Sequence, residues 1–261
     1  MTMALAILAL AAFGYLVAAV GFQYNLFKER RHDWRPWTTI LLISHGLHTV
    51  ALGLLTYQLG HLPMARMDEA IATLAWLVIG LYVGVGRRWK VEVVGTVAAP
   101  AACVMTAFAT VAMAGDTSAP QRSAWLLVHV GSLVASYAAF TLAAACAGLY
   151  FWQARHLKRK RLSGTFRMLP SLDTLDRVAY RFILTGFPLM VLGIVSGLMI
   201  SNWNWSWDPR ETIVAVTCGV FATYLHLRLA GWQGRPVNLV LLVAYVCVVL
   251  SFLVRGTVHS A

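Results

Sequence analysis

The chain has 261 residues, of which 59% are hydrophobic and only 12% are charged, and its mean hydropathy is +0.70. Soluble domains carry about 25% charged residues, so this composition indicates a multi-pass membrane protein and excludes an ordinary soluble domain. The net charge of +11 does not indicate a nucleic-acid-binding protein, because the basic residues form short clusters between apolar runs, as membrane topology requires.

Eight apolar segments are long enough to cross a bilayer as helices, which takes about 20 residues each. In chain order they are residues 3–26, 38–60, 69–86, 92–114, 123–152, 180–200, 211–230 and 237–256. Before the sixth segment, a short amphipathic helix is expected after Pro170, with Leu172, Leu175 and Val178 at helical spacing. The sequence therefore predicts an all-α, polytopic membrane protein. Residues 1–261 are expected to form a single integral-membrane domain, with N-terminal spans over 1–115 and a core over 116–261.

The distribution of basic residues predicts the orientation of these spans. With the N-terminus outside, the inner connections hold 17 of the 21 Lys and Arg residues. The outer segments hold only Arg66, Arg122, Arg210 and Arg255. By the positive-inside rule, both termini and the connection at residues 201–212 are expected on the extracytoplasmic side.

The four cysteines stand singly in apolar runs, with no CxxC, CxxCH or zinc-type spacing. Thiol redox chemistry and covalent haem attachment to this chain are therefore not expected. These cysteines are expected to act as small buried apolar residues.

Two histidines lie deep in apolar segments, where an ionisable residue is a candidate functional residue. His48 is 13 residues from His61 at the outer end of its span, which corresponds to about 20 Å. His226 is 15 residues from Glu211 at the outer start of its span, which corresponds to about 22 Å. Two imidazoles at similar depth could ligate one haem iron axially. The alternative is that each is a polar packing residue, and His45 is either a substitute ligand or a neighbour that orients His48.

A second pair of histidines is expected toward the outer side. His129 lies near the outer start of the fifth span, and His259 lies at the outer end of the eighth. Taken singly, each is an interfacial histidine or a ligand. Because they flank a tryptophan-rich connection, we interpret them as a second axial pair.

That connection has the sequence SNWNWSWDPRET, in which Trp203, Trp205 and Trp207 recur with period two. In an extended segment this period puts all three rings on one face, which would form a platform for a flat hydrophobic ligand such as a porphyrin. An aromatic belt at the membrane interface is the alternative.

The second half of the same stretch predicts the start of a helix. Asp208 is expected at the N-cap, Pro209 at the first helical position and Glu211 at the third, as in a capping box. Arg210 is either a partner for a carboxylate, such as a haem propionate, or a solvated loop charge.

Several of these stretches resemble one family. WSWDPRET resembles the tryptophan-rich WWD signature of haem-handling proteins of cytochrome c maturation. The stretches that resemble the CcsA (ResC) branch of that family are LHTVALGLLTYQLGHLP, VHVGSLVASYAAF, LPSLDTLDRVAYR, TGFPLMVLGIVSGLMI, TYLHLR, GWQGRPVNLV and VHSA. They cover most of residues 41–261, and Ser201 and Asn202 stand where the family usually has Trp-Gly.

The resemblance implies a subunit of the System II cytochrome c synthase in the bacterial cytoplasmic membrane. With a CcsB (ResB)-like partner, such a subunit carries haem b outward and presents it to the CxxCH motif of apocytochrome c. It also implies that His48 and His226 are transmembrane haem ligands and that His129 and His259 are external ones. The expected partners are therefore that protein, apocytochrome c and the lipid bilayer.

Two other functions are weighed against this one. A HemX-like haem-binding regulator without synthase activity has the same eight-span layout but usually lacks the tryptophan signature. A small-molecule transporter unrelated to haem has no supporting pattern of substrate-site residues.

Overall fold

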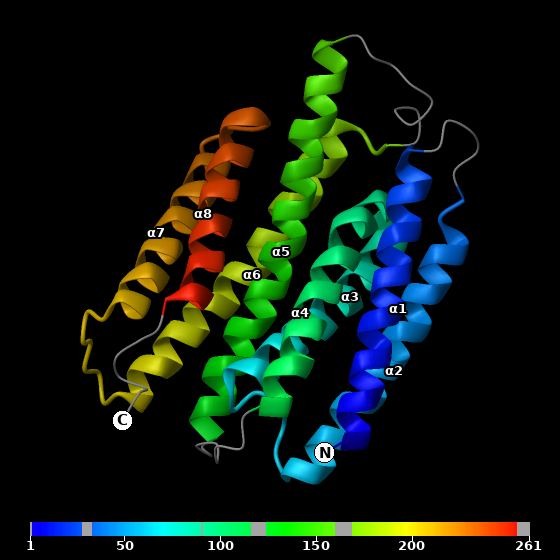
Figure 1. Cartoon of the computed structure of the whole chain (residues 1–261). Coiled ribbons are helices and arrows are strands. Elements are labelled where there is room, and N and C mark those ends of the chain that lie inside the picture. The colour runs from blue at the N-terminus through cyan, green and yellow to red at the C-terminus, as the bar shows by residue number, and fades with distance from the viewer. Residues whose placement is uncertain (1, 28–32, 90, 116–123, 160–168, 255–261) are drawn as a thin grey trace.

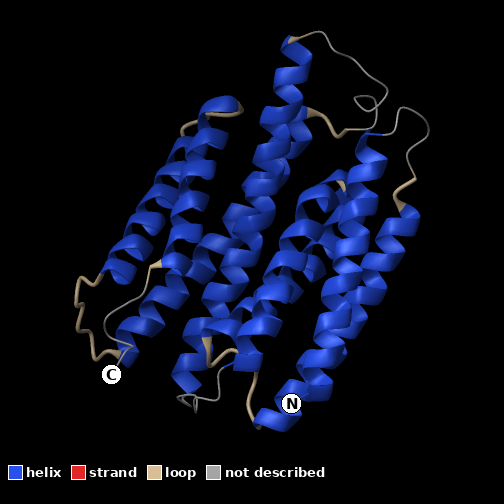
Figure 2. Ribbon diagram, in the orientation of Figure 1, coloured by secondary structure: helices blue, strands red, loops and turns tan. Residues whose placement is uncertain are grey.

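The computed structural model describes residues 2–27, 33–89, 91–115, 124–159 and 169–254, and this part of the chain is helical (Figures 1 and 2). The long helices are α1 (Thr2–Phe27), α2 (Arg35–Leu59), α3 (Met67–Trp89), α4 (Gly95–Gly115), α5 (Ala124–Lys158), α6 (Leu172–Ile200), α7 (Pro209–Leu229) and α8 (Arg235–Leu253), and a 3₁₀ turn, η1 (Glu92–Val94), precedes α4. All eight are long and apolar enough to cross a membrane. The expected all-α, multi-pass fold is therefore confirmed.

Consecutive helices run in opposite directions, which gathers their ends into two groups (Figure 1). The lower group in the view contains the starts of α1, α3, α5 and α7 and the ends of α2, α4, α6 and α8. Arg35, Arg88 and Arg228 belong to helix ends of the upper group. Arg66 and Arg210 belong to the lower group. In the described part of the chain, the Lys and Arg residues are thus concentrated at one end of the bundle.

The helices lie in a lateral order that places α5 near the centre. α1 packs against α2 and α4, and α3 packs against α4 and α5. α5 then packs against α6 and α8, and α7 packs mainly against α8. In Figure 1, α7 and α8 form one edge of the bundle, and α1 and α2 form the opposite edge.

The most extensive helix pair is α5 with α6, and glycines let the two backbones approach closely. A Cβ atom at Gly186 would lie 2.7 Å from the ring of Phe140, and one at Gly193 would lie 2.6 Å from Leu133. Such distances leave no room for a side chain. In lipid, where burial of apolar surface does not drive helix association, close packing of small residues is what holds helices together.

Two helices extend beyond their expected spans. α6 begins at Leu172, so the expected short amphipathic helix is the first part of α6 and not a separate element. Leu175 and Val178 are buried there, and Ser171 caps the helix by accepting a hydrogen bond from the Thr174 amide. α5 has 35 residues, which corresponds to about 52 Å, longer than the hydrocarbon core of about 30 Å. Its basic last turn therefore extends past the membrane-spanning part.

We predict that Gly186→Leu lowers the stability of the α5–α6 pair by about 1–3 kcal/mol, because the new side chain overlaps Phe140. Gly148→Leu on α5 is the matched control, since a Cβ there meets nothing within 4 Å. Thermal unfolding of the two variants in detergent measures the difference. Equal unfolding midpoints would show that α5 and α6 do not depend on this close approach.

Candidate functional site

The connection between α6 and α7, residues 201–208, does not adopt the extended form that the alternation predicts. Asn202, Trp203 and Trp207 have positive φ angles of 53°, 62° and 55°. The chain first closes the end of α6, where the Trp203 amide donates to the Leu198 carbonyl at 2.7 Å. Left-handed residues interrupt an extended strand, so the period of two does not by itself place the three indole rings on one face.

The tryptophan rings lie in different environments. Trp203 is 67% exposed and Trp207 is 73% exposed. Trp205 is half-buried and meets Trp207 edge to face, with ring centroids 5.9 Å apart at 74°. The Trp205 indole N–H is buried and has no hydrogen-bond partner among the described residues. The connection thus presents two exposed rings and one half-buried ring whose N–H is buried.

The predicted start of α7 is confirmed in its main feature. The Asp208 carboxylate accepts a hydrogen bond from the Glu211 amide at 2.8 Å, and Pro209 follows at the first helical position. The Glu211 carboxylate reaches back to Ser206, where it accepts from both the amide and the hydroxyl at 2.9 Å. These bonds fix the tryptophan connection to the helix that follows it.

Arg210 lies half-exposed beside this cap. It makes no hydrogen bond or ion pair with any other residue that the structure describes. It is close enough to the Tyr137 hydroxyl of α5 to interact with it electrostatically.

His129 lies in α5 at the same end of the bundle, against the backbone of α6. Its Nδ1 is 2.7 Å from the Gly193 carbonyl oxygen, so Nδ1 carries the proton and the lone pair is on Nε2. The ring occupies space left by Gly197, because a Cβ there would lie 2.7 Å from the imidazole. A carbonyl that accepts the Nδ1 proton is the usual second partner of a metal-ligating histidine. His259, the expected companion, lies outside the described residues.

His226 lies in the last turn of α7, at the other end of the bundle. The buried face of α7 carries Thr217, Phe221 and Tyr224. His226 is exposed on the opposite face, in line with the small residues Ala215, Gly219 and Ala222. A Cβ at Gly219 would meet nothing within 4 Å. The imidazole therefore stands at the end of an open strip without bulky side chains.

His48 is in a different environment, inside the packing of α1, α2 and α3. It is fully buried, and its Nδ1 is 3.2 Å from the Tyr15 hydroxyl. Its Nε2 has no hydrogen-bond partner in the part of the chain that the structure describes. His45 stacks on Trp76 with ring centroids 5.4 Å apart and also buries a ring nitrogen without a described partner.

The structure does not bring His48 and His226 together. α2 and α7 lie at opposite edges of the bundle in Figure 1. The depths also differ, because His48 is 11 residues from the end of α2 and His226 is 17 residues from the start of α7. These counts correspond to a difference of about 9 Å in distance from the respective helix ends. A single haem between these two histidines is therefore not compatible with this arrangement.

Comparison with known proteins identifies the family. The sequence profile described as cytochrome C assembly protein matches residues 40–259. The chain belongs to this cytochrome c assembly family. The matched range contains every candidate haem ligand named above and omits α1.

Several relatives match most of this chain. The cytochrome c biogenesis protein CcsA of Synechococcus sp. strain CC9902 is 33% identical, over 94% of this chain and 91% of the relative. CcsA of Synechococcus sp. strain RCC307 is 32% identical over 88% and 85%, and CcsA of Mesostigma viride is 30% identical over 82% and 80%. The protein is thus a CcsA-like cytochrome c biogenesis protein with multiple transmembrane helices.

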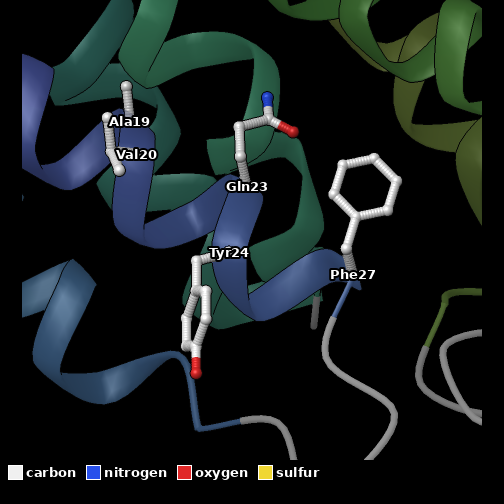
Figure 3. A pocket seen from close by; sticks show the side chains of 5 residues that line it. All are labelled: Ala19, Val20, Gln23, Tyr24 and Phe27. Carbon is white, nitrogen blue, oxygen red and sulfur yellow. The ribbon is translucent and has the colours of Figure 1, made fainter.

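Two features of this CcsA-like chain were not anticipated from the sequence. Asp176 of α6 forms a buried ion pair with Arg228 of α7. Two features of the sequence could have indicated this pair. Asp176 is an acidic residue in an amphipathic segment, and Arg228 is two positions from His226. The second feature is an open groove of about 580 Å³ on α1, lined by Ala19, Val20, Gln23, Tyr24 and Phe27 (Figure 3). No candidate ligand lines it, so we do not assign it to haem.

We predict that Asp208→Ala loosens the start of α7 by about 1 kcal/mol, because the Glu211 amide loses its cap. Faster amide hydrogen exchange across residues 201–212 would report the change. Ser201→Ala is the control, since its hydroxyl donates to the Leu198 carbonyl of α6 and to nothing in α7 among the described residues. Unchanged exchange in Asp208→Ala would mean that other contacts hold the connection.

Proposed function

We propose that this protein carries haem b across the bacterial cytoplasmic membrane and presents it for covalent attachment to apocytochrome c. It would do so as a subunit of a holocytochrome c synthase, together with a CcsB-type membrane partner. The observation that carries the proposal is the placement of two histidines at opposite ends of the bundle. His129 is oriented by the Gly193 carbonyl and lies beside the tryptophan connection, and His226 lies exposed at the other end. In this proposal the end with His129 faces the extracytoplasmic side, as the basic residues at the other end favour.

The outer site is built on His129. Its Nε2 lone pair suits axial ligation of iron, with His259 proposed as the second ligand. Trp203 and Trp207 are exposed and able to turn toward a porphyrin face, and the buried Trp205 N–H suits a carboxylate acceptor. Arg210, which pairs with no described carboxylate, suits a haem propionate.

Asp208 has a different role in this proposal from the neighbouring tryptophans. Its carboxylate is occupied by the Glu211 amide, and it is buried. We therefore assign it to positioning the tryptophan connection on α7, and not to direct contact with iron.

The inner site is built on His226. An iron porphyrin is flat, and the strip of small residues below His226 leaves the space that a flat ring requires. Because His48 is buried near the opposite edge of the bundle, the second ligand of this iron is proposed to come from the partner chain. His48 and His45 then form a separate buried cluster whose role in haem binding has its own test.

At the outer site, apocytochrome c would be the acceptor. The histidine of its CxxCH motif would replace one axial ligand, and each cysteine thiol would add across a vinyl group, forming a C–S and a C–H bond. The protein contributes binding, orientation and protection of the iron, and the porphyrin supplies the reactive groups.

The spectroscopic prediction separates the histidines. The full chain, purified with its partner from haem-replete cells, is expected to carry haem b with a low-spin, bis-histidine spectrum. His129→Ala should remove the outer haem and His226→Ala the inner haem, because each loses an axial ligand. His48→Ala should retain both, since its ring is sealed within the bundle. A chain without haem, or a spectrum unchanged by His129→Ala and His226→Ala, would contradict the proposal.

The second prediction distinguishes a synthase from a HemX-like regulator. With reduced haem, the partner and a CxxCH peptide, the purified protein should form a covalent haem–peptide product. A regulator would bind haem without forming that product. The peptide AxxAH is the control, because it keeps the histidine and lacks both thiols.

A further inference from the structure

A buried carboxylate joins α6, α7 and α8 at the inner end of the bundle. Asp176 of α6 accepts a hydrogen bond from the Arg228 guanidinium of α7 at 2.7 Å. It also accepts from the Asn238 side-chain amide of α8 at 2.6 Å and from the Gly234 backbone amide at 3.3 Å. One side chain thus collects donors from two other helices and from the turn between them.

Both charges of this cluster are almost fully removed from solvent. The Asp176 side chain is 5% exposed and the Arg228 side chain is 7% exposed. The guanidinium also lies 4.7 Å from the ring centroid of Tyr180, which adds a cation–π contact. A buried charge is tolerated only when it is paired and hydrogen-bonded, and here both conditions are met.

The cluster lies directly behind His226. Arg228 and His226 are two residues apart on α7, so their side chains point about 200° apart around the helix axis. Arg228 continues the buried row of Thr217, Phe221 and Tyr224, and it is the last member before α7 ends at Leu229. The final turn of a helix frays unless something holds it, and this ion pair holds the face opposite His226.

We propose that Asp176 is a positioning residue for His226. By anchoring Arg228 to α6 and α8, it fixes the last turn of α7 and so the direction in which the exposed imidazole points. The inference rests on the proposed role of His226 as a haem ligand. Asp176 itself does not touch the haem in this arrangement.

The test uses the full chain with its partner, with the additional substitution His129→Ala. The measured haem content and spectrum then come from the inner haem alone. Asp176→Asn keeps the size of the side chain and removes the charge that Arg228 requires. We expect the haem content to fall by about tenfold or more, as when outer-shell partners of metal ligands are lost. The remaining haem should show a high-spin component that added imidazole converts to low-spin. Asp176→Glu, which keeps the carboxylate, should recover part of the signal.

The matched control is Asp173→Asn on the same helix, whose pair with Arg177 is exposed. It should leave haem content and spectrum unchanged. Helical circular dichroism and monodispersity in detergent establish that each variant is folded. If Asp176→Asn does not accumulate, Asn238→Leu removes one donor, keeps both charges and should give a smaller shift of the same kind.

The outcomes separate this inference from the proposed function. If His226→Ala keeps the inner haem signal, the proposed role of His226 fails. If His226→Ala loses that signal while folded Asp176→Asn, or folded Asn238→Leu in its place, keeps both haem content and low-spin spectrum, the positioning role is overturned and the proposed function stands.

Discussion

The close approach of α5 and α6 is the constraint on which the rest of the molecule depends. Glycines at 186, 193 and 197 bring the backbones so near that Phe140, Leu133 and His129 of α5 fill the space where side chains of α6 would stand. The same contact that stabilises the pair therefore also places His129. Its Nδ1 meets the Gly193 carbonyl because no Cβ at Gly197 keeps the ring away.

Because α6 packs closely against α5, the groups at the two ends of α6 also have defined positions. At one end it leads into the tryptophan connection, which Asp208 and Glu211 fasten to the start of α7. At the other end it supplies Asp176, which fastens the last turn of the same α7. Between these points, Phe221 of α7 stacks on Phe140 of α5, with ring centroids 3.9 Å apart. α7 is thus fixed near its two ends and at its middle. The opposite face of α7, which carries His226, is exposed.

The sequence predicts the helices well because long apolar segments indicate a lipid environment. In a bilayer such segments must satisfy their own backbone hydrogen bonds, as a helix does. The N-cap at Asp208 and the proline at 209 are confirmed because capping depends on the local sequence, while the Glu211 carboxylate bonds Ser206 and not the N-cap amide. Depth estimated from the sequence was not enough to predict whether His48 and His226 pair, because depth along the bundle carries no information about the lateral order of helices. The extended form assumed for the tryptophan connection was wrong, because alternation requires β-region φ angles and Asn202, Trp203 and Trp207 do not adopt them.

The difference in burial between His48 and His226 explains which of the two suits a haem that must enter and leave. His48 is sealed among α1, α2 and α3 beside Tyr15, so a porphyrin there would have to displace the packed core. His226 stands exposed in the last turn of α7, on the face that no other described helix covers, so its ring is accessible to a ligand. A haem iron that takes a second ligand from a partner chain can bind there without disturbing the bundle. The exposed face of α7 is therefore the face on which the proposed transfer depends, and α6 is the helix that keeps it in place.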